Sequence, residues 1–179
     1  MRFNRANFWL TANNFTTMLQ FLFLSTFVLF SSNSLASLQL QADYVLVNKS
    51  ARTLLLLKDN QIIKSYSISL GKNPIGAKRQ RGDKKTPEGI YNIDFKNRQS
   101  KFHLSLHINY PNQLDKQHSG KDNLDPGGSI YIHGLPNKKR NAGLLIGSDW
   151  TNGCIAVSNK EIRDIAKYVP DGTPIEITP

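Results

Sequence analysis

Cysteine is almost absent from this sequence: Cys154 is the one cysteine among 179 residues. No internal disulfide can form, so the thiol is buried and inert, paired with another chain, or present for its reactivity. Its surroundings favour reactivity, because it follows Thr151-Asn152-Gly153 and a strand-like run ending in His133 lies upstream. A thiol needs a base to become a thiolate near neutral pH, and His133 is the nearest candidate in sequence.

Acidic residues are also scarce, since 13 Asp and Glu stand against 23 Lys and Arg, a net charge of +10. Such an excess of positive charge favours an anionic polymer or an anionic membrane surface as a partner. Neither a nucleic-acid-binding motif nor a cysteine–histidine cluster with metal-ligand spacing is found. We therefore expect no nucleic-acid partner, no metal and no cofactor.

The N-terminal segment has no acidic residue before Asp43 and begins with a basic stretch containing Arg2 and Arg5. An apolar run of 13 residues, Met18–Phe30, is followed by small residues at Ser34 and Ala36. This pattern predicts a cleavable signal peptide over residues 1–36 and export to the periplasm or cell envelope. The run is shorter than the ~20 residues of a membrane span. The alternative is an uncleaved anchor, and only then would the membrane be a partner.

Residues 37–179 are predicted to form one domain of short strands. The expected strands lie at residues 43–48, 53–58, 61–70, 89–95, 104–108, 129–133, 154–157 and 174–178. One helix is expected after Ser158, where Ser158 and Glu161 match a capping box and apolar residues follow at helical spacing. Residues 71–85 and 120–128 are expected to be loops. The predicted fold class is mainly β (a β-rich α+β fold): a sandwich or barrel of short mixed strands with a late capped helix.

The segments around the histidine and the cysteine resemble the active-site signature of YkuD-type L,D-transpeptidases. That signature is a histidine, a spacer, and Ser/Thr-x-Gly-Cys; here 17 residues separate His133 from Thr151. Thr86-Pro87-Glu88-Gly89 and Ile108-Asn109-Tyr110-Pro111-Asn112 resemble two further segments of the family. The likeness extends from about Asp43 to Thr178, and the four pieces occur in the family's order.

The resemblance implies a cysteine acyltransferase that acts on peptidoglycan stem peptides through a thioester. Cys154 would attack the carbonyl carbon, and His133 would hold the proton and return it to the leaving amine. The family's histidine is oriented by a main-chain carbonyl, which maps onto Gly134. Amides near Gly153 and Cys154 are expected to form an oxyanion hole.

The expected outcome of this pairing is that His133 lowers the pKa of Cys154 below about 8.5. The resemblance also implies substrate contacts from Tyr110, Thr151 and Asn152. The acceptor is a stem amine or a wall-tethered protein in a transpeptidase, and water in an L,D-carboxypeptidase or amidase. A non-catalytic wall-binding domain is a third reading, which an intact Cys154 and His133 disfavour.

Two positions depart from the family pattern. Asn152 stands where a second histidine is usual, and Ala156 stands where an arginine is usual. An asparagine can exchange hydrogen bonds but cannot act as a base, and the absent arginine removes a partner for a substrate carboxylate. Trp150, just before the motif, is expected either to reshape the pocket or to pack as ordinary core.

The remaining polar residues are interpreted as follows. His103 and His107 are expected on one face of a strand, and His118 in a polar loop. Most of the basic residues between Lys72 and Lys85 are expected to form a solvated loop, which could also attract stem-peptide carboxylates. The basic residues 138–140 are expected to form a solvated loop or part of a lid.

Overall fold

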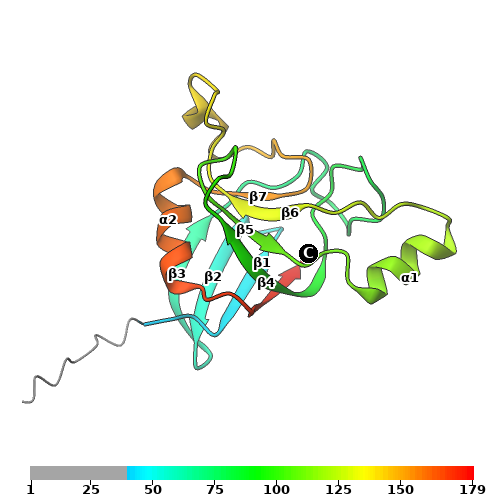
Figure 1. Cartoon of the computed structure of the whole chain (residues 1–179), viewed down its shortest axis with the longest axis horizontal. Coiled ribbons are helices and arrows are strands. Elements are labelled where there is room, and N and C mark those ends of the chain that lie inside the picture. Colours follow the sequence, from blue (N-terminus) through cyan, green and yellow to red (C-terminus); the bar gives the residue numbers. More distant parts are fainter. Residues whose placement is uncertain (1–39) are drawn as a thin grey trace, which may run out of the picture. The chain divides into compact units, whose positions relative to one another are not determined.

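The computed structural model describes residues 40–179, in which eight strands form one curled sheet with the order β3-β2-β1-β8-β4-β5-β6-β7 (Figure 1). The strands are β1 (Tyr44–Asn48), β2 (Thr53–Lys58), β3 (Gln61–Ser67), β4 (Gly89–Asn97), β5 (Ser105–Ile108), β6 (Ile130–His133), β7 (Ile155–Ala156) and β8 (Thr173–Thr178). The helices are α1 (Gln113–Lys121) and α2 (Asn159–Tyr168), with a 3-10 turn, η1, at Ala142–Leu145. The prediction of a mainly β fold is confirmed.

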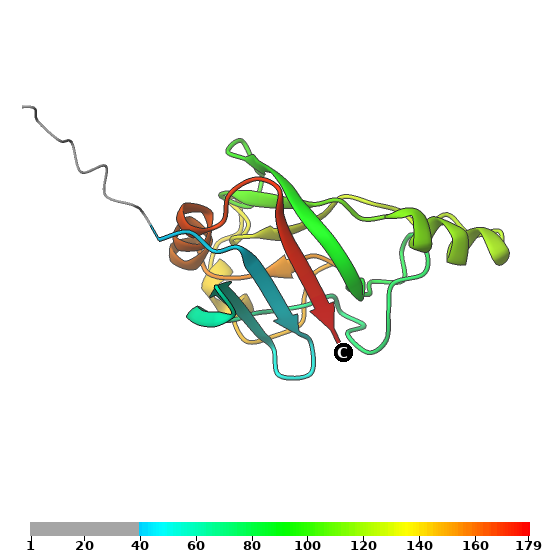
Figure 2. The same cartoon turned by 90° about the horizontal axis from the view of Figure 1, so that it is seen from below.

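The predicted hairpin is present as β2 and β3, which pair antiparallel around Asp59-Asn60. Both turn residues have positive φ, 50° and 61°, the conformation of the turns that suit the twist of a tight hairpin. The C-terminal strand β8 lies between β1 and β4, parallel to β1 and antiparallel to β4 (Figure 2). The first and the last strand of the described chain thus lie side by side.

The two ends of the sheet meet beyond β3. Ser69, just after β3, exchanges two backbone hydrogen bonds of 2.8 Å with Ala156 of β7. A second bridge joins Gly71 to Thr151. Strand β3 therefore ends at Ser67 rather than at residue 70, because the chain leaves β2 to pair with the opposite edge. This curling gives the sheet its barrel-like form and brings Gly71 beside the segment that precedes Cys154.

The capping box of the late helix is confirmed. The Ser158 amide donates to Glu161 at 2.8 Å, and the Glu161 amide donates to Ser158 Oγ at 3.2 Å. Ile162 and Ile165 are fully buried and join the core that the inward residues of the sheet supply. Helix α2 therefore closes one end of this core, whereas α1 projects at the opposite end in both views (Figures 1 and 2).

Helix α1 is not among the predicted elements. Its residues are polar and Ser119 is the one buried side chain, so no apolar periodicity marks it. Its start does carry a signal, because Asn112 and Asp115 cap each other at 2.9 and 3.0 Å. The expectation that His118 lies in a loop is wrong, since it lies in α1.

Other predicted boundaries shift by one or two residues. Strand β4 continues to Asn97, and β7 is shorter than predicted, at Ile155–Ala156. In strand β1, Val45 and Val47 are buried and Leu46 is half-buried. Within residues 40–179 no helix has the length and apolar character that would suit a membrane crossing. The predicted signal peptide lies outside the described residues.

Candidate active site

Strands β6 and β7 bring the predicted histidine and cysteine together. They pair in parallel, with Ile132 opposite Ile155 and His133 opposite Ala156. His133 ends β6, and Cys154 directly precedes β7. Both side chains line one hollow of ≈ 380 Å³, which also includes Tyr131 and Phe102.

The tautomer of His133 follows from its contact with the next residue. Nδ1 lies 2.6 Å from the carbonyl oxygen of Gly134, and a carbonyl oxygen can only accept a hydrogen bond. Nδ1 therefore carries the proton, and Nε2 keeps its lone pair as a base. The carbonyl that the resemblance assigned to Gly134 is in the expected place.

Gly134 is required at its position by close packing. Its amide donates to the carbonyls of Phe102 and Leu104 at 3.1 and 3.2 Å. A Cβ there would lie 2.6 Å from Asn159 Oδ1 and 3.1 Å from Ile162. A larger residue would displace the carbonyl that orients His133.

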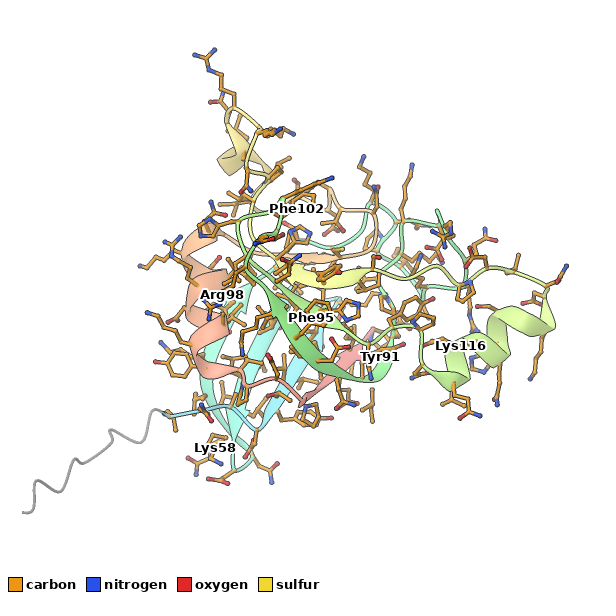
Figure 3. The ribbon with its side chains drawn as sticks, viewed as in Figure 1. Lys58, Tyr91, Phe95, Arg98, Phe102 and Lys116 are labelled. Atoms are coloured by element: carbon orange, nitrogen blue, oxygen red, sulfur yellow. The ribbon has the colours of Figure 1, made fainter. Side chains whose placement is uncertain are left out.

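Aromatic rings enclose the His133 imidazole. Phe102 lies 4.5 Å away and Trp150 lies 5.6 Å away between ring centroids, and His133 is 3% exposed (Figure 3 labels Phe102). This burial lowers the pKa of His133, although the Gly134 carbonyl opposes the shift. The imidazole is therefore neutral at neutral pH. Trp150 packs on the imidazole, as the packing alternative predicts, and it is not among the residues that line the hollow shared by His133 and Cys154.

The Cys154 thiol lies 3.6 Å from the carbonyl oxygen of Ser129. Burial raises the pKa of Cys154, and a backbone hydrogen bond from Tyr131 together with the charge of Lys78 offsets part of that increase. The expectation that His133 lowers this pKa is wrong for the resting site, because a neutral imidazole has no charge with which to stabilise a thiolate. The resting pair is therefore a neutral thiol and a neutral imidazole.

Thr151 holds the cysteine loop in place. Its Oγ1 donates to the carbonyl of Cys154 at 2.7 Å and accepts the amide of Gly153 at 3.1 Å. Thr151 is buried and has this structural role, while its predicted contact with substrate stays a prediction. The Gly153 amide is occupied by this contact, so of the two amides expected in the oxyanion hole only that of Cys154 remains a candidate.

Gly153 has φ of +126°, and a Cβ there would lie 2.6 Å from the carbonyl oxygen of Lys85. Both features require glycine. The close approach packs the cysteine loop against residues 84–86, a segment that Gly71 also touches. The glycine therefore allows the cysteine loop to pack closely against this segment.

Asn152 is exposed and lines a second hollow of ≈ 370 Å³ on the other side of Cys154. Lys78, Arg81 and Lys84 line the same hollow. The cysteine thus lies between two hollows, an aromatic one beside His133 and a basic one beside Asn152.

The basic loop between Lys72 and Lys85 is not simply solvated. Lys78 is 6% exposed, and its Nζ lies 2.8 Å from both Asp83 Oδ1 and the carbonyl of Gln80. Asp83 also accepts the amides of Arg79, Gln80 and Lys85 at 2.8 to 3.1 Å. One acidic residue therefore organises the loop, and its isolation in a basic stretch was the signal in the sequence.

Tyr110 is buried, and its hydroxyl donates to the carbonyl of Pro126 at 3.1 Å. Its ring packs edge-on against Tyr91 at 5.9 Å. It supports the segment after β5, and its predicted contact with substrate stays a prediction.

The other histidines have separate partners. His107 Nδ1 lies 2.7 Å from Asp94 Oδ1, and His103 Nε2 lies 2.7 Å from Arg163. His103 has φ of 68° and precedes β5, so the two are not on one strand face. Among the described residues no group of three or more His, Cys, Asp or Glu side chains is arranged to hold a metal ion.

Sequence reasoning did not identify Phe102, Tyr131 and Ser129 as parts of the site. Tyr131 could have been found, because residues two apart in a strand share a face and His133 follows it by two. Phe102 carries no such signal, since only folding places its loop over β6.

Comparisons with known proteins identify the family of this chain. The family model of the YkuD L,D-transpeptidase catalytic domain matches residues 42–177. The protein named "Putative L,D-transpeptidase YqjB" of Bacillus subtilis is 30% identical over 139 residues, which cover 75% of this chain and 70% of that protein. The chain therefore belongs to the YkuD-type L,D-transpeptidase catalytic domain family.

Two solved structures resemble the fold. The helical cell shape determining protein Pgp2 of Campylobacter jejuni has a TM-score of 0.58 and 29% identity, covering 75% of this chain and 46% of its own. Bd1075 of Bdellovibrio bacteriovorus has a TM-score of 0.53 and 30% identity, covering 78% of this chain and 48% of its own. The chain spans about half the length of these two proteins.

Proposed function

We propose that this domain is a cysteine acyltransferase that acts on peptidoglycan stem peptides outside the cytoplasm, with Cys154 as the nucleophile and His133 as the base. The observation that carries the proposal is the orientation of His133, whose Nδ1–H is held by Gly134 while its ring shares a hollow with Cys154. A non-catalytic wall-binding domain needs neither feature.

In the proposed reaction, Nε2 of His133 accepts the thiol proton as the Cys154 sulfur attacks the scissile carbonyl carbon. The carbonyl oxygen takes up the negative charge beside the Cys154 amide. Collapse of the tetrahedral intermediate breaks the amide bond, and His133 returns the proton to the departing amine. The acyl group is then a thioester on Cys154.

The basic hollow suits a donor with a free carboxylate. Lys84 is exposed there, and the buried Lys78 adds positive charge close enough to influence Cys154. We propose that the exposed Lys84 takes the place of the family's arginine, whose position is occupied by the buried Ala156. The leaving terminal D-alanine of a tetrapeptide stem carries such a carboxylate.

The thioester can be resolved by a stem amine, by an amine of a wall-tethered protein, or by water. The first two outcomes are transpeptidation, and the third is carboxypeptidase or amidase activity. Similarity to Pgp2, a cell shape determining protein, supports a role in wall remodelling. Asn152, exposed beside the nucleophile, is our candidate for an acceptor contact.

Purified protein incubated with disaccharide-tetrapeptides tests the proposal, with the products identified by mass spectrometry. We expect loss of the terminal D-alanine and a mass adduct on Cys154 with a carbapenem-type acylating agent. Cys154→Ala is expected to form no adduct and to release D-alanine more slowly by several orders of magnitude, while keeping the fold. Turnover near wild type in Cys154→Ala would overturn the proposal.

A further inference from the structure

Three aromatic side chains form a ladder across the outer face of the sheet. Phe95 of β4 is paired in register with His107 of β5, and His107 is paired with Tyr131 of β6. Phe95 and His107 stack with centroids 4.7 Å apart and an interplanar angle of 17°, and Tyr131 meets His107 edge-on at 4.8 Å. The three residues are called the aromatic ladder below.

A β-bulge turns Phe95 toward solvent. The pairing of β4 with β5 shifts between Ile93 and Phe95, so Asp94 is the extra residue. Tyr91 and Ile93 point into the core, and regular alternation would bury Phe95 as well. Instead Phe95 is 43% exposed, and Figure 3 shows it over β4 and β5, on the side toward the viewer. Bulges commonly re-aim a side chain near an active site.

The ladder is fixed before any ligand arrives. Asp94 Oδ1 lies 2.7 Å from His107 Nδ1, so the bulge residue also sets the plane of the ring on which Phe95 stacks. An exposed aromatic ring held by its neighbours loses little side-chain entropy on binding. The local structure thus presents a preformed strip of aromatic side chains.

The ladder is continuous with the aromatic hollow. Tyr131 belongs to both, and it shares the outer face of β6 with His133, two residues later. The wall of the hollow nearest the end of β4 is polar, formed by Asn97, Gln99, Ser100 and Lys101. Aromatic rings therefore lie beside amide and hydroxyl groups and the Lys101 amine, in the hollow that Cys154 also lines.

This combination suits a saccharide. A pyranose ring has an apolar face of C–H groups that packs on aromatic rings, and an edge of hydroxyl and acetamido groups that hydrogen-bonds with amides and hydroxyls. The exposed aromatic area of the strip is small, because Phe95 is exposed whereas His107 and Tyr131 are half-buried. Protein–protein interfaces usually need about 800 Å² on each partner, so a chain-like ligand fits this strip better.

We propose that the aromatic ladder binds the glycan strand to which the stem peptide is attached, placing sugar rings on Phe95 and Tyr131 while the peptide enters the hollow. The proposal rests on the proposed function for the identity of the polymer. It assigns Phe95 to substrate binding, with no part in the chemistry.

The first test measures binding without any peptide. Peptide-free N-acetylglucosamine–N-acetylmuramic acid oligomers and chitotetraose are titrated into the full chain and followed by NMR. We expect shifts in β4–β6 resonances, and a loss of affinity of about fivefold to tenfold in Phe95→Ala with recovery in Phe95→Tyr. Ile90→Ala is the matched control, since Ile90 is an exposed apolar residue of β4 outside the ladder. Absence of binding, or equal loss in the control, would overturn the proposal.

The second test compares two donors, a free tetrapeptide and a disaccharide-tetrapeptide. We expect Phe95→Ala to raise KM about fivefold to tenfold for the disaccharide donor alone, with kcat unchanged. Equal effects on both donors would overturn the proposal, as would a wild-type dimer that Phe95→Ala dissociates. If neither donor is turned over but the oligomers bind through Phe95, the proposed function fails and the glycan site stands.

Discussion

Thr151 Oγ1 donates a hydrogen bond of 2.7 Å to the carbonyl oxygen of Cys154, so the first residue of the cysteine motif is hydrogen-bonded to the last one. The same oxygen accepts the Gly153 amide at 3.1 Å. Thr151→Val keeps the shape but removes both hydrogen bonds and leaves a buried amide unpaired. We expect a loss of ~1–3 kcal/mol in the free energy of unfolding, and slower acylation of Cys154.

Urea denaturation and the rate of carbapenem adduct formation measure these two effects. Thr151→Ser is the control, because it retains the hydroxyl and should restore most of the loss. A Thr151→Val protein with unchanged stability and acylation rate would contradict this role.

The neutral thiol–imidazole pair predicts a distinct pH dependence of reactivity. Burial raises the pKa of Cys154, so alkylation by iodoacetamide, which needs the thiolate, should increase only above pH ~8.5. Burial lowers the pKa of His133, so its neutral base form persists below pH ~6.5. Acylation by substrate should therefore decline only as the pH falls through the lowered pKa of His133.

Labelling reports on one site, because Cys154 is the one thiol in the sequence. Rates are measured by intact-protein mass spectrometry from pH 5 to pH 10 for wild type and His133→Ala. An alkylation inflection well below 8.5 that is lost in His133→Ala would instead establish a preformed ion pair.

The Lys78–Asp83 pair predicts strong coupling between two loop residues. Their side chains are 4% and 9% exposed, so Lys78→Met leaves a buried carboxylate without its cation. We expect Lys78→Met to cost ~3 kcal/mol in the free energy of unfolding, and the double variant with Asp83→Asn to cost less than the sum of the single ones. Urea denaturation of the four proteins gives the coupling, and additive losses would show that the pair is not a unit.

The same pair predicts an acid-dependent loss of stability. Burial alone would raise the pKa of Asp83, but Lys78 and three backbone amides outweigh it and hold the pKa below its ordinary value. Because the folded pKa is the lower one, the contribution of Asp83 is fully present above its unfolded pKa of about 4 and is lost as the pH falls through the folded pKa. Asp83→Asn should flatten the stability profile in that acid range.

Asn152 is expected to influence the choice of acceptor and not the acylation step. Its side chain is exposed and cannot take a proton at neutral pH, so Asn152→Ala should reduce turnover about fivefold, equivalent to ~1 kcal/mol. The ratio of cross-linked to hydrolysed products, by mass spectrometry, should change in Asn152→Ala and in Asn152→His. A shifted pH profile of acylation in Asn152→Ala would place this residue in the catalytic machinery instead.

The sequence by itself determined the family, the mainly β fold, the β2–β3 hairpin, the capped helix α2 and the pairing of His133 with Cys154. Each rests on local chemistry: turn residues with positive φ, a capping box, and a motif of fixed spacing. Helix α1 was not predicted because its polar sequence has no apolar face, although Asn112 and Asp115 match a capping box in the sequence.

Tertiary structure alone decided what surrounds the pair. Only the curling of the sheet brings Gly71 to Thr151, and only the loop before β5 places Phe102 on His133. The directions of the pKa shifts of His133 and Cys154 depend on burial, which is a property of the packed site and not of the motif. The burial of Tyr110 and the outward turn of Phe95 likewise follow from packing and register, because the sequence does not encode either one locally.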